Sequence, residues 1–124
     1  MIKKTFIYDT SRGFAALLKQ YYSDKMDIHI CVSKKCVKNY KIKDFEVCFF
    51  IVNEYEDLFL LPDIYFEIEH FFVTTPKKYF IKKIENLKLE HAVIIDFDYS
   101  KKDMLKVIDY NLSRFVLNAS STEV

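Results

Sequence analysis

The chain is poor in glycine, because Gly13 is the only one among its 124 residues. Phosphate-binding loops need several glycines, since the backbone must approach the ligand closely. A Walker loop and a dinucleotide-binding fingerprint are therefore excluded. We predict no cofactor.

Long apolar runs are missing as well. The apolar residues that follow the basic start of the chain are interrupted by Asp9, Ser11 and Arg12, too early for a secretory signal. No segment approaches the roughly 20 continuous apolar residues of a membrane-spanning helix. We therefore expect a cytoplasmic protein without a membrane span.

Cysteine is scarce, and the spacing of the cysteines gives no sign of a disulfide framework. Cys31, Cys36 and Cys48 are odd in number and form no C-x-x-C pair. This pattern favours reduced, mostly buried thiols over a disulfide framework or a zinc site.

An excess of either charge is also absent. Nineteen basic and eighteen acidic side chains give a formal charge of +1, which supplies no general attraction to nucleic acid or anionic membrane. Lys77, Lys78, Lys82 and Lys83 form a local basic face. We interpret it as a solvated helix face, with a nucleic-acid contact as the weaker alternative.

What the chain does contain is enough material for one folded domain. Its hydrophobic fraction of 51% can build a core, and its charged fraction of 30% can cover the surface. We predict one domain over residues 1–117. Residues 118–124 are polar without periodicity, so we predict a flexible C-terminal tail there.

Five short, apolar segments typical of strands alternate with segments of helical spacing. The predicted strands are residues 4–8, 26–32, 46–52, 71–73 and 92–95. Residues 54–70 carry no firm prediction, because Pro62 interrupts any helix there. Strict alternation indicates a three-layer α/β fold with parallel strands and helices on both faces. Ligands of such sheets gather at the carboxyl ends of the strands.

The order of elements resembles that of response-regulator receiver domains. Asp9 after the first strand, Thr74 and Thr75 after the fourth, and residues 99–105 before the last helix carry the resemblance, which spans residues 3–116. It implies a (βα)5 CheY-like, flavodoxin-like fold, whose five-stranded parallel sheet has the order 2-1-3-4-5.

The same resemblance places a phosphorylation pocket at four positions. Receivers use an acidic pair that holds a divalent metal, an aspartate that accepts phosphate, a hydroxyl and a lysine. The matching residues here are Asp9, Asn53, Thr75 and Phe97, and Thr74 is an alternative for the hydroxyl.

This pocket is predicted to be degenerate. Neither Asn53 nor Ile51, the alternative for the acceptor, can form an acyl phosphate. The candidates for the lysine position are Asp96, Phe97 and Asp98, and none is basic. The resemblance therefore implies a receiver that has lost phosphorylation.

Three acidic residues offer a different use of the same edge. Asp9, Asp96 and Asp98 are oxygen donors that suit Mg²⁺ or Ca²⁺. No fixed spacing supports such a site, so we interpret them as loop and cap carboxylates and predict no metal.

Aromatic residues mark the predicted interaction face. Receivers meet partners through the fourth helix, fifth strand and fifth helix, where this chain carries Tyr79, Phe80, Tyr99 and Tyr110. The alternative is that these rings pack the helices onto the sheet. We predict a non-catalytic signalling module that binds another signalling protein or a second copy of itself. A small flavodoxin-like enzyme, or a ligand- or metal-binding domain using the acidic edge, is the alternative.

Overall fold

The computed structural model describes the backbone of residues 3–122 and the side chains of residues 3–114. The chain divides into two compact units, residues 1–94 and 95–124. The single domain predicted for residues 1–117 stays a prediction.

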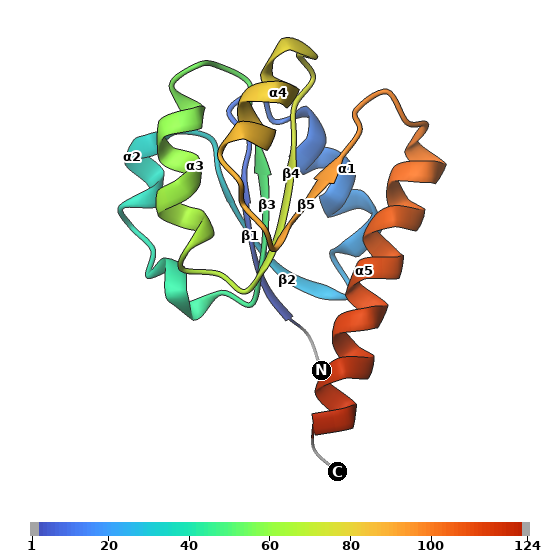
Figure 1. Cartoon of the computed structure of the whole chain (residues 1–124). Helices are drawn as coiled ribbons and strands as arrows, with labels where there is room; N and C mark the ends of the chain where they lie inside the picture. Colours follow the sequence, from blue (N-terminus) through green and yellow to red (C-terminus); the bar gives the residue numbers. More distant parts are fainter. Residues whose placement is uncertain (1–2, 123–124) are drawn as a thin grey trace. The chain divides into compact units, whose positions relative to one another are not determined.

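Five parallel strands form one sheet in the order β2-β1-β3-β4-β5 (Figure 1). The strands are β1 (Lys3–Tyr8), β2 (Met26–Cys31), β3 (Val47–Ile51), β4 (His70–Thr74) and β5 (Ala92–Ile95). The predicted fold class and strand order are confirmed.

Burial of each strand follows from its sequence. All five residues of β3 are buried, as expected for a continuous apolar run in the middle of a parallel sheet. In β2, at the edge, only Met26 and Cys31 are buried, in keeping with its alternating polar residues. β3 is therefore completely covered, whereas β2 is partly exposed.

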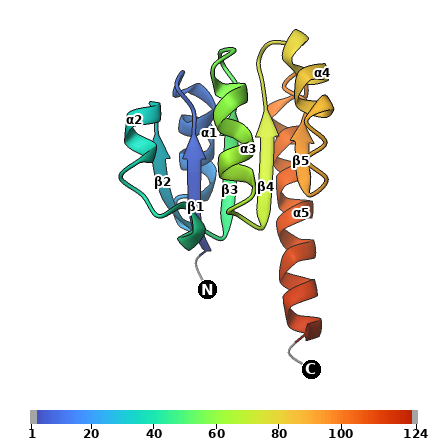
Figure 2. The same ribbon diagram turned by 60° about the vertical axis from the view of Figure 1, so that its left-hand side comes forward.

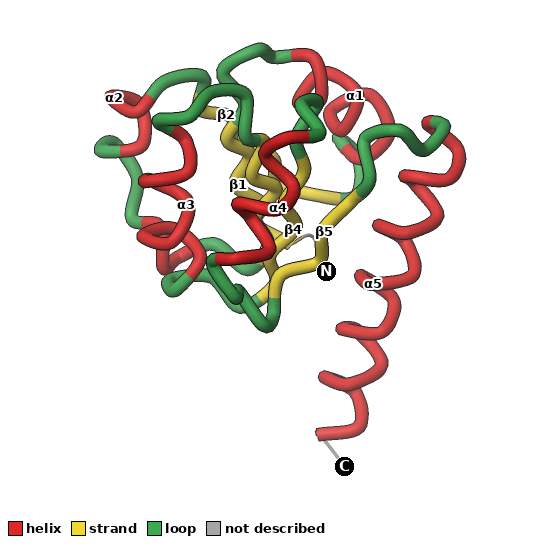
Figure 3. Tube along the Cα trace, turned by 45° about the horizontal axis from the view of Figure 1, so that its top comes forward, coloured by secondary structure: helices red, strands yellow, loops and turns green. Residues whose placement is uncertain are grey.

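Five helices accompany the strands. They are α1 (Gly13–Tyr22), α2 (Lys34–Val37), α3 (Asp57–Tyr65), α4 (Tyr79–Asn86) and α5 (Lys101–Thr122), with a 3-10 turn at Ile42–Asp44. Figures 2 and 3 show α3 on one face of the sheet and α1 on the other. One apolar cluster joins Tyr8 and Phe50 of the sheet to Leu61 of α3 and Phe80 of α4.

Helix α3 passes through Pro62, which the sequence pattern predicts to interrupt a helix. Proline inside a helix costs about 3 kcal/mol. Leu58, Leu61 and Ile64 are buried on the inner side of α3, and burial of each such side chain contributes roughly 1.5–3 kcal/mol. Packing against the sheet therefore outweighs the cost of the proline.

A disulfide joins Cys31 and Cys36, whose Cα atoms lie 5.5 Å apart. The prediction of reduced thiols is wrong for this pair. Oγ of Ser33 accepts a hydrogen bond from the Cys36 N–H and starts α2 directly after β2, so the chain turns back and brings the cysteines together. Cys48 is free and fully buried in β3, and burial raises the pKa of its thiol.

Helix α5 continues through most of the stretch that the sequence pattern predicts as a tail. Residues 101–122 contain no glycine or proline to end a helix, and residues 123–124 lie outside the described part. Oγ of Ser100 accepts from the N–H of Asp103 at 3.1 Å and caps the helix start. Within residues 3–122, no helix has both the length and the apolar character needed to cross a membrane.

Candidate functional site

Asp9 and Asn53 meet at the carboxyl ends of the two central strands. β1 and β3 are neighbours, with Tyr8 opposite Phe50, so the residues after each strand reach the same edge of the sheet. Nδ2 of Asn53 donates a hydrogen bond of 2.8 Å to Oδ1 of Asp9. Ile51, the alternative position, is buried within β3. The structure thus brings Asn53 beside Asp9.

The Asp9 carboxylate is completely buried and accepts four hydrogen bonds. Oδ1 accepts from the Ser11 N–H at 3.1 Å, the Ser11 hydroxyl at 2.8 Å and the Asn53 amide. Oδ2 accepts from the Ala15 N–H at 3.0 Å. A buried carboxylate needs such donors to offset its lost hydration. Three of the four donors bond to Oδ1 and one bonds to Oδ2, so protein groups contact both oxygens.

The same carboxylate caps helix α1. Ala15 lies in the first turn of that helix, and its N–H would otherwise lack an acceptor. Oγ of Ser11 also lies at the helix start, where it accepts from the N–H of Gly13 at 3.5 Å. Oγ1 of Thr10 accepts from the Asn53 amide at 3.2 Å. Arg12 takes the left-handed conformation, with φ of 70°, and this turn lets Asp9 reach the helix.

Asp57 is a buried acidic residue that sequence analysis missed. Its Oδ2 accepts from the N–H groups of Asn53 at 2.9 Å and Glu54 at 3.0 Å, and its Oδ1 accepts from the Tyr8 hydroxyl at 3.3 Å. Burial, reinforced by the negative charge of Asp57, raises the pKa of Tyr8 well above its usual value. An aspartate in the first turn of a helix is the signal that could have drawn attention to this position.

Thr75 lies at the same edge but uses its hydroxyl for the backbone. Its Oγ1 donates to the carbonyl of Val52 at 2.7 Å and accepts from the N–H of Lys77 at 3.2 Å. The side chain is buried. The hydroxyl therefore ties the end of β3 to the turn before α4. Thr74, the alternative, is buried as the last residue of β4.

The remaining pocket candidates belong to the second unit. Phe97 is 39% exposed. The N–H of Asp98 donates to Oδ1 of Asp96 at 2.8 Å, which makes a local turn. Among residues 3–122, no three His, Cys, Asp or Glu side chains gather as metal ligands would.

The aromatic residues of the predicted interaction face differ in exposure. Tyr79, Tyr99 and Tyr110 are exposed. Phe80 is only 3% exposed and belongs to the core cluster, so its prediction as a surface residue is wrong. It lies four residues before the buried Ile84, and this spacing turns both side chains toward the sheet.

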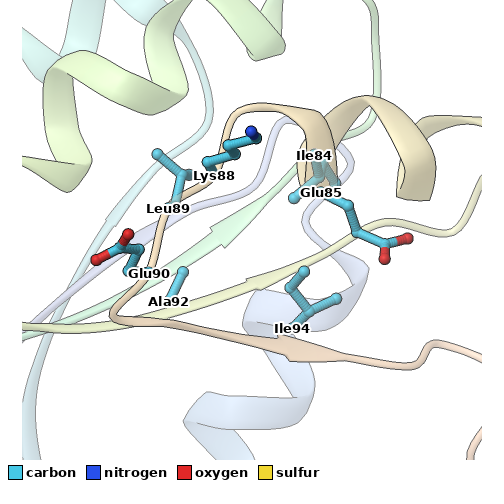
Figure 4. A pocket seen from close by; sticks show the side chains of 7 residues that line it. All are labelled: Ile84, Glu85, Lys88, Leu89, Glu90, Ala92 and Ile94. Carbon is cyan, nitrogen blue, oxygen red and sulfur yellow. The ribbon is translucent and has the colours of Figure 1, made fainter.

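A pocket of about 270 Å³ opens between the end of α4 and β5 (Figure 4). Its lining residues are Ile84, Glu85, Lys88, Leu89, Glu90, Ala92 and Ile94. None of them belongs to the Asp9–Asn53 network. The volume is slightly below the range of about 300–1,000 Å³ typical of small-molecule sites.

Solved structures of other proteins share the fold of this chain. No family model matches the chain, and no curated protein sequence does so significantly. Among solved structures, a response regulator receiver domain protein (CheY-like) from Methanospirillum hungatei is 14% identical, with a TM-score of 0.64, covering 92% of this chain and 96% of its own. The chain has the fold of a response-regulator receiver domain.

Two further solved structures, one of them a receiver domain, have similar scores. The BeF3-activated DrrB receiver domain is 8% identical, with a TM-score of 0.61, covering 91% of this chain and 99% of its own. A structure described as adenylate cyclase from Rhodopirellula baltica is 14% identical, with a TM-score of 0.66, covering 99% and 96%. The resemblance to receivers seen in the sequence is confirmed at the level of the fold.

Proposed function

We propose that this protein is a non-catalytic, receiver-like signalling module that acts by protein–protein contact and independently of aspartyl phosphorylation. The hydrogen bond between Asn53 and Asp9 carries this proposal. A working receiver presents a carboxylate after the third strand, whereas this chain presents an amide. An amide is no nucleophile toward phosphorus, and here it also donates to the carboxylate that would help to hold the metal.

The state of the neighbouring groups supports the same function. The Thr75 hydroxyl bonds to the backbone, and Asp57 accepts from the N–H groups of Asn53 and Glu54 in the loop before α3. Each polar group at this edge thus stabilises the loops in one arrangement. We infer that the module has a fixed surface that partners recognise, and that no chemical step at the sheet edge switches it.

Exposed aromatic side chains support contact with another protein. Tyr79 and Tyr110 are 64% and 62% exposed, and large exposed rings are enriched at protein interfaces. Receiver domains in general signal through partners and are not enzymes. The partner in this proposal is another signalling protein or a second copy of the chain, and the proposed compartment is the cytoplasm.

The test is incubation of the protein with Mg²⁺ and acetyl phosphate or phosphoramidate, followed by intact mass and NMR spectra. We expect no added phosphoryl mass and no Mg²⁺-dependent shifts near Asp9, Asn53 or Thr75. A hydroxylamine-sensitive phosphoryl adduct on the wild-type chain would overturn the proposal. A phosphorylatable receiver treated in parallel shows that the donor is active.

A further inference from the structure

Three aromatic side chains form an exposed ridge along α3. Tyr55, Phe59 and Phe66 are 52%, 64% and 78% exposed. Their spacing of four and seven residues places them on one side of the helix and its flanking turns. The rings of Tyr55 and Phe59 meet edge to face, with centroids 5.5 Å apart. Exposed aromatic side chains that line one side of a helix mark a contact surface. We call these three residues the aromatic ridge.

An acidic strip lies beside the ridge. Glu56, Asp63 and Glu67 are exposed and are also spaced by seven and four residues. Since a helix turns by about 100° per residue, Phe59 lies between Tyr55 and this strip. The acidic strip therefore borders the ridge on the side away from Tyr55.

Lys83 of α4 borders the ridge on its other side, at Tyr55, and Lys82 precedes it in the same helix. Nζ of Lys83 lies 5.3 Å from the centre of the Tyr55 ring, which fixes α4 as the neighbour of Tyr55. Lys82 and Lys83 are both exposed. Across this surface, the order is thus lysines, aromatic ridge, acidic strip. Positive charge therefore lies on one side of the apolar centre and negative charge on the other.

We propose that this α3–α4 surface binds a second copy of the chain as a twofold dimer. A twofold axis that runs along the ridge places ridge on ridge and brings each acidic strip opposite the lysines of the other copy. An axis across the ridge would place like charges together. In an isologous interface each patch must complement itself, and this pattern does so. The inference deepens the proposed function by naming the partner, and it rests on that function for its role in signalling.

The oligomeric state in solution is the first measurement. Sedimentation velocity over a series of protein concentrations is expected to show a reversible monomer–dimer equilibrium. The dimer should weaken as salt rises, because exposed charge pairs are screened. A wild-type chain that stays monomeric at every concentration would overturn the proposal.

A charge swap then tests the geometry. One variant carries Glu56→Lys, Asp63→Lys and Glu67→Lys, and the other carries Lys82→Glu and Lys83→Glu. Each alone is expected to raise the dimer Kd by at least about tenfold through like-charge repulsion. Their equimolar mixture should form a heterodimer, since each altered strip then faces its complement. If the mixture fails to associate although the wild type dimerises, the proposed arrangement is wrong.

The ridge has a matched control. Phe59→Ser removes an exposed ring from the ridge and is expected to weaken the dimer, whereas Tyr21→Ser removes an exposed ring from α1 and should leave the Kd unchanged. Equal effects of the two variants would contradict the assignment. These readouts are independent of phosphoryl transfer, so failure of the dimer and failure of phosphorylation independence are distinguishable.

Discussion

Replacing Asn53 with aspartate tests the closed pocket most directly. The amide nitrogen lies 2.8 Å from Oδ1 of Asp9, Asn53 is 8% exposed and Asp9 is fully buried. The new carboxylate would meet a second carboxylate at hydrogen-bond distance. The substitution also removes the contact of the amide with Thr10. We therefore expect Asn53→Asp to destabilise the protein at neutral pH.

The magnitude follows from two competing terms. Two unit charges about 3 Å apart repel by roughly 5–6 kcal/mol at an effective dielectric constant of about 20. Protonating one carboxyl with an ordinary pKa near 3.9 costs about 4 kcal/mol at pH 7. Protonation is the cheaper outcome, and the resulting acid can donate to Asp9 again. We expect a loss of about 3–4 kcal/mol at pH 7.

The sign of the pH dependence is distinctive. The shared proton means that one carboxyl pKa is raised in the folded variant, so the folded state binds more protons than the unfolded state between the ordinary pKa and the raised one. Stability of Asn53→Asp should therefore rise as the pH falls from 7 toward 5, relative to wild type. Two adjacent carboxylates also suit Mg²⁺, so millimolar Mg²⁺ should stabilise the variant and leave the wild type unchanged.

Urea denaturation followed by circular dichroism measures these effects at pH 5 and 7, with EDTA or with Mg²⁺. The matched control is Asn53→Ala, which loses the amide without adding charge. It should cost about 1–3 kcal/mol and respond to neither pH nor Mg²⁺ beyond wild type. If Asn53→Asp is as stable as wild type at pH 7 in EDTA, the amide does not hold the pocket closed.

Tyr8→Phe removes one hydrogen-bond donor to Asp57 and should lower the free energy of unfolding by about 1–2 kcal/mol. Asp57→Ala leaves three donors without their acceptor and should lower it by about 2–4 kcal/mol. Urea denaturation measures both losses, and equal losses would contradict the role of Asp57. Burial lowers the pKa of His70, so the unfolded state binds more protons below about pH 6.5 and stability should fall on acidification. His70→Gln should lessen that fall in acid titrations. Cys36→Ser removes the disulfide and should lower the free energy of unfolding by about 2 kcal/mol through the loop entropy of the unfolded chain. Alkylation of the wild type under non-reducing conditions should leave Cys31 and Cys36 unmodified.

The sheet was predictable because its signal is local. The apolar run of Val47–Ile51 specifies a doubly covered strand, and the alternation in Met26–Cys31 specifies an edge. Parallel strands then send Asp9 and Asn53 to the same edge, so their proximity follows from topology and a register set by alternation. The absence of a carboxylate at position 53, and with it the loss of phosphoryl acceptance, could therefore be predicted from the sequence alone.

Features that depend on distant partners could not be predicted. The position of Asp57 in the first turn of a helix is a local signal, but its contact with the Tyr8 hydroxyl, 49 residues earlier in the chain, is not. Helix α3 tolerates Pro62 because its inner side packs on the sheet. In both cases the decisive contact is tertiary, and local sequence patterns do not reveal it. The disulfide is a different case, because Cys31 and Cys36 are five residues apart and the turn capped by Ser33 that brings them together is local.

The closed edge and the aromatic ridge are joined by one short segment. Asn53 bonds to Asp9 through its side chain and to Asp57 through its N–H, and Tyr55 of the ridge lies between Asn53 and Asp57 in the chain. The hydrogen bonds that close the pocket thus also fix the start of α3. A ridge held this way has the same form whether or not a phosphodonor is present. Dimer affinity should therefore be insensitive to Mg²⁺ and acetyl phosphate beyond their effect on ionic strength, and it should be set by the aromatic ridge and the charges that flank it.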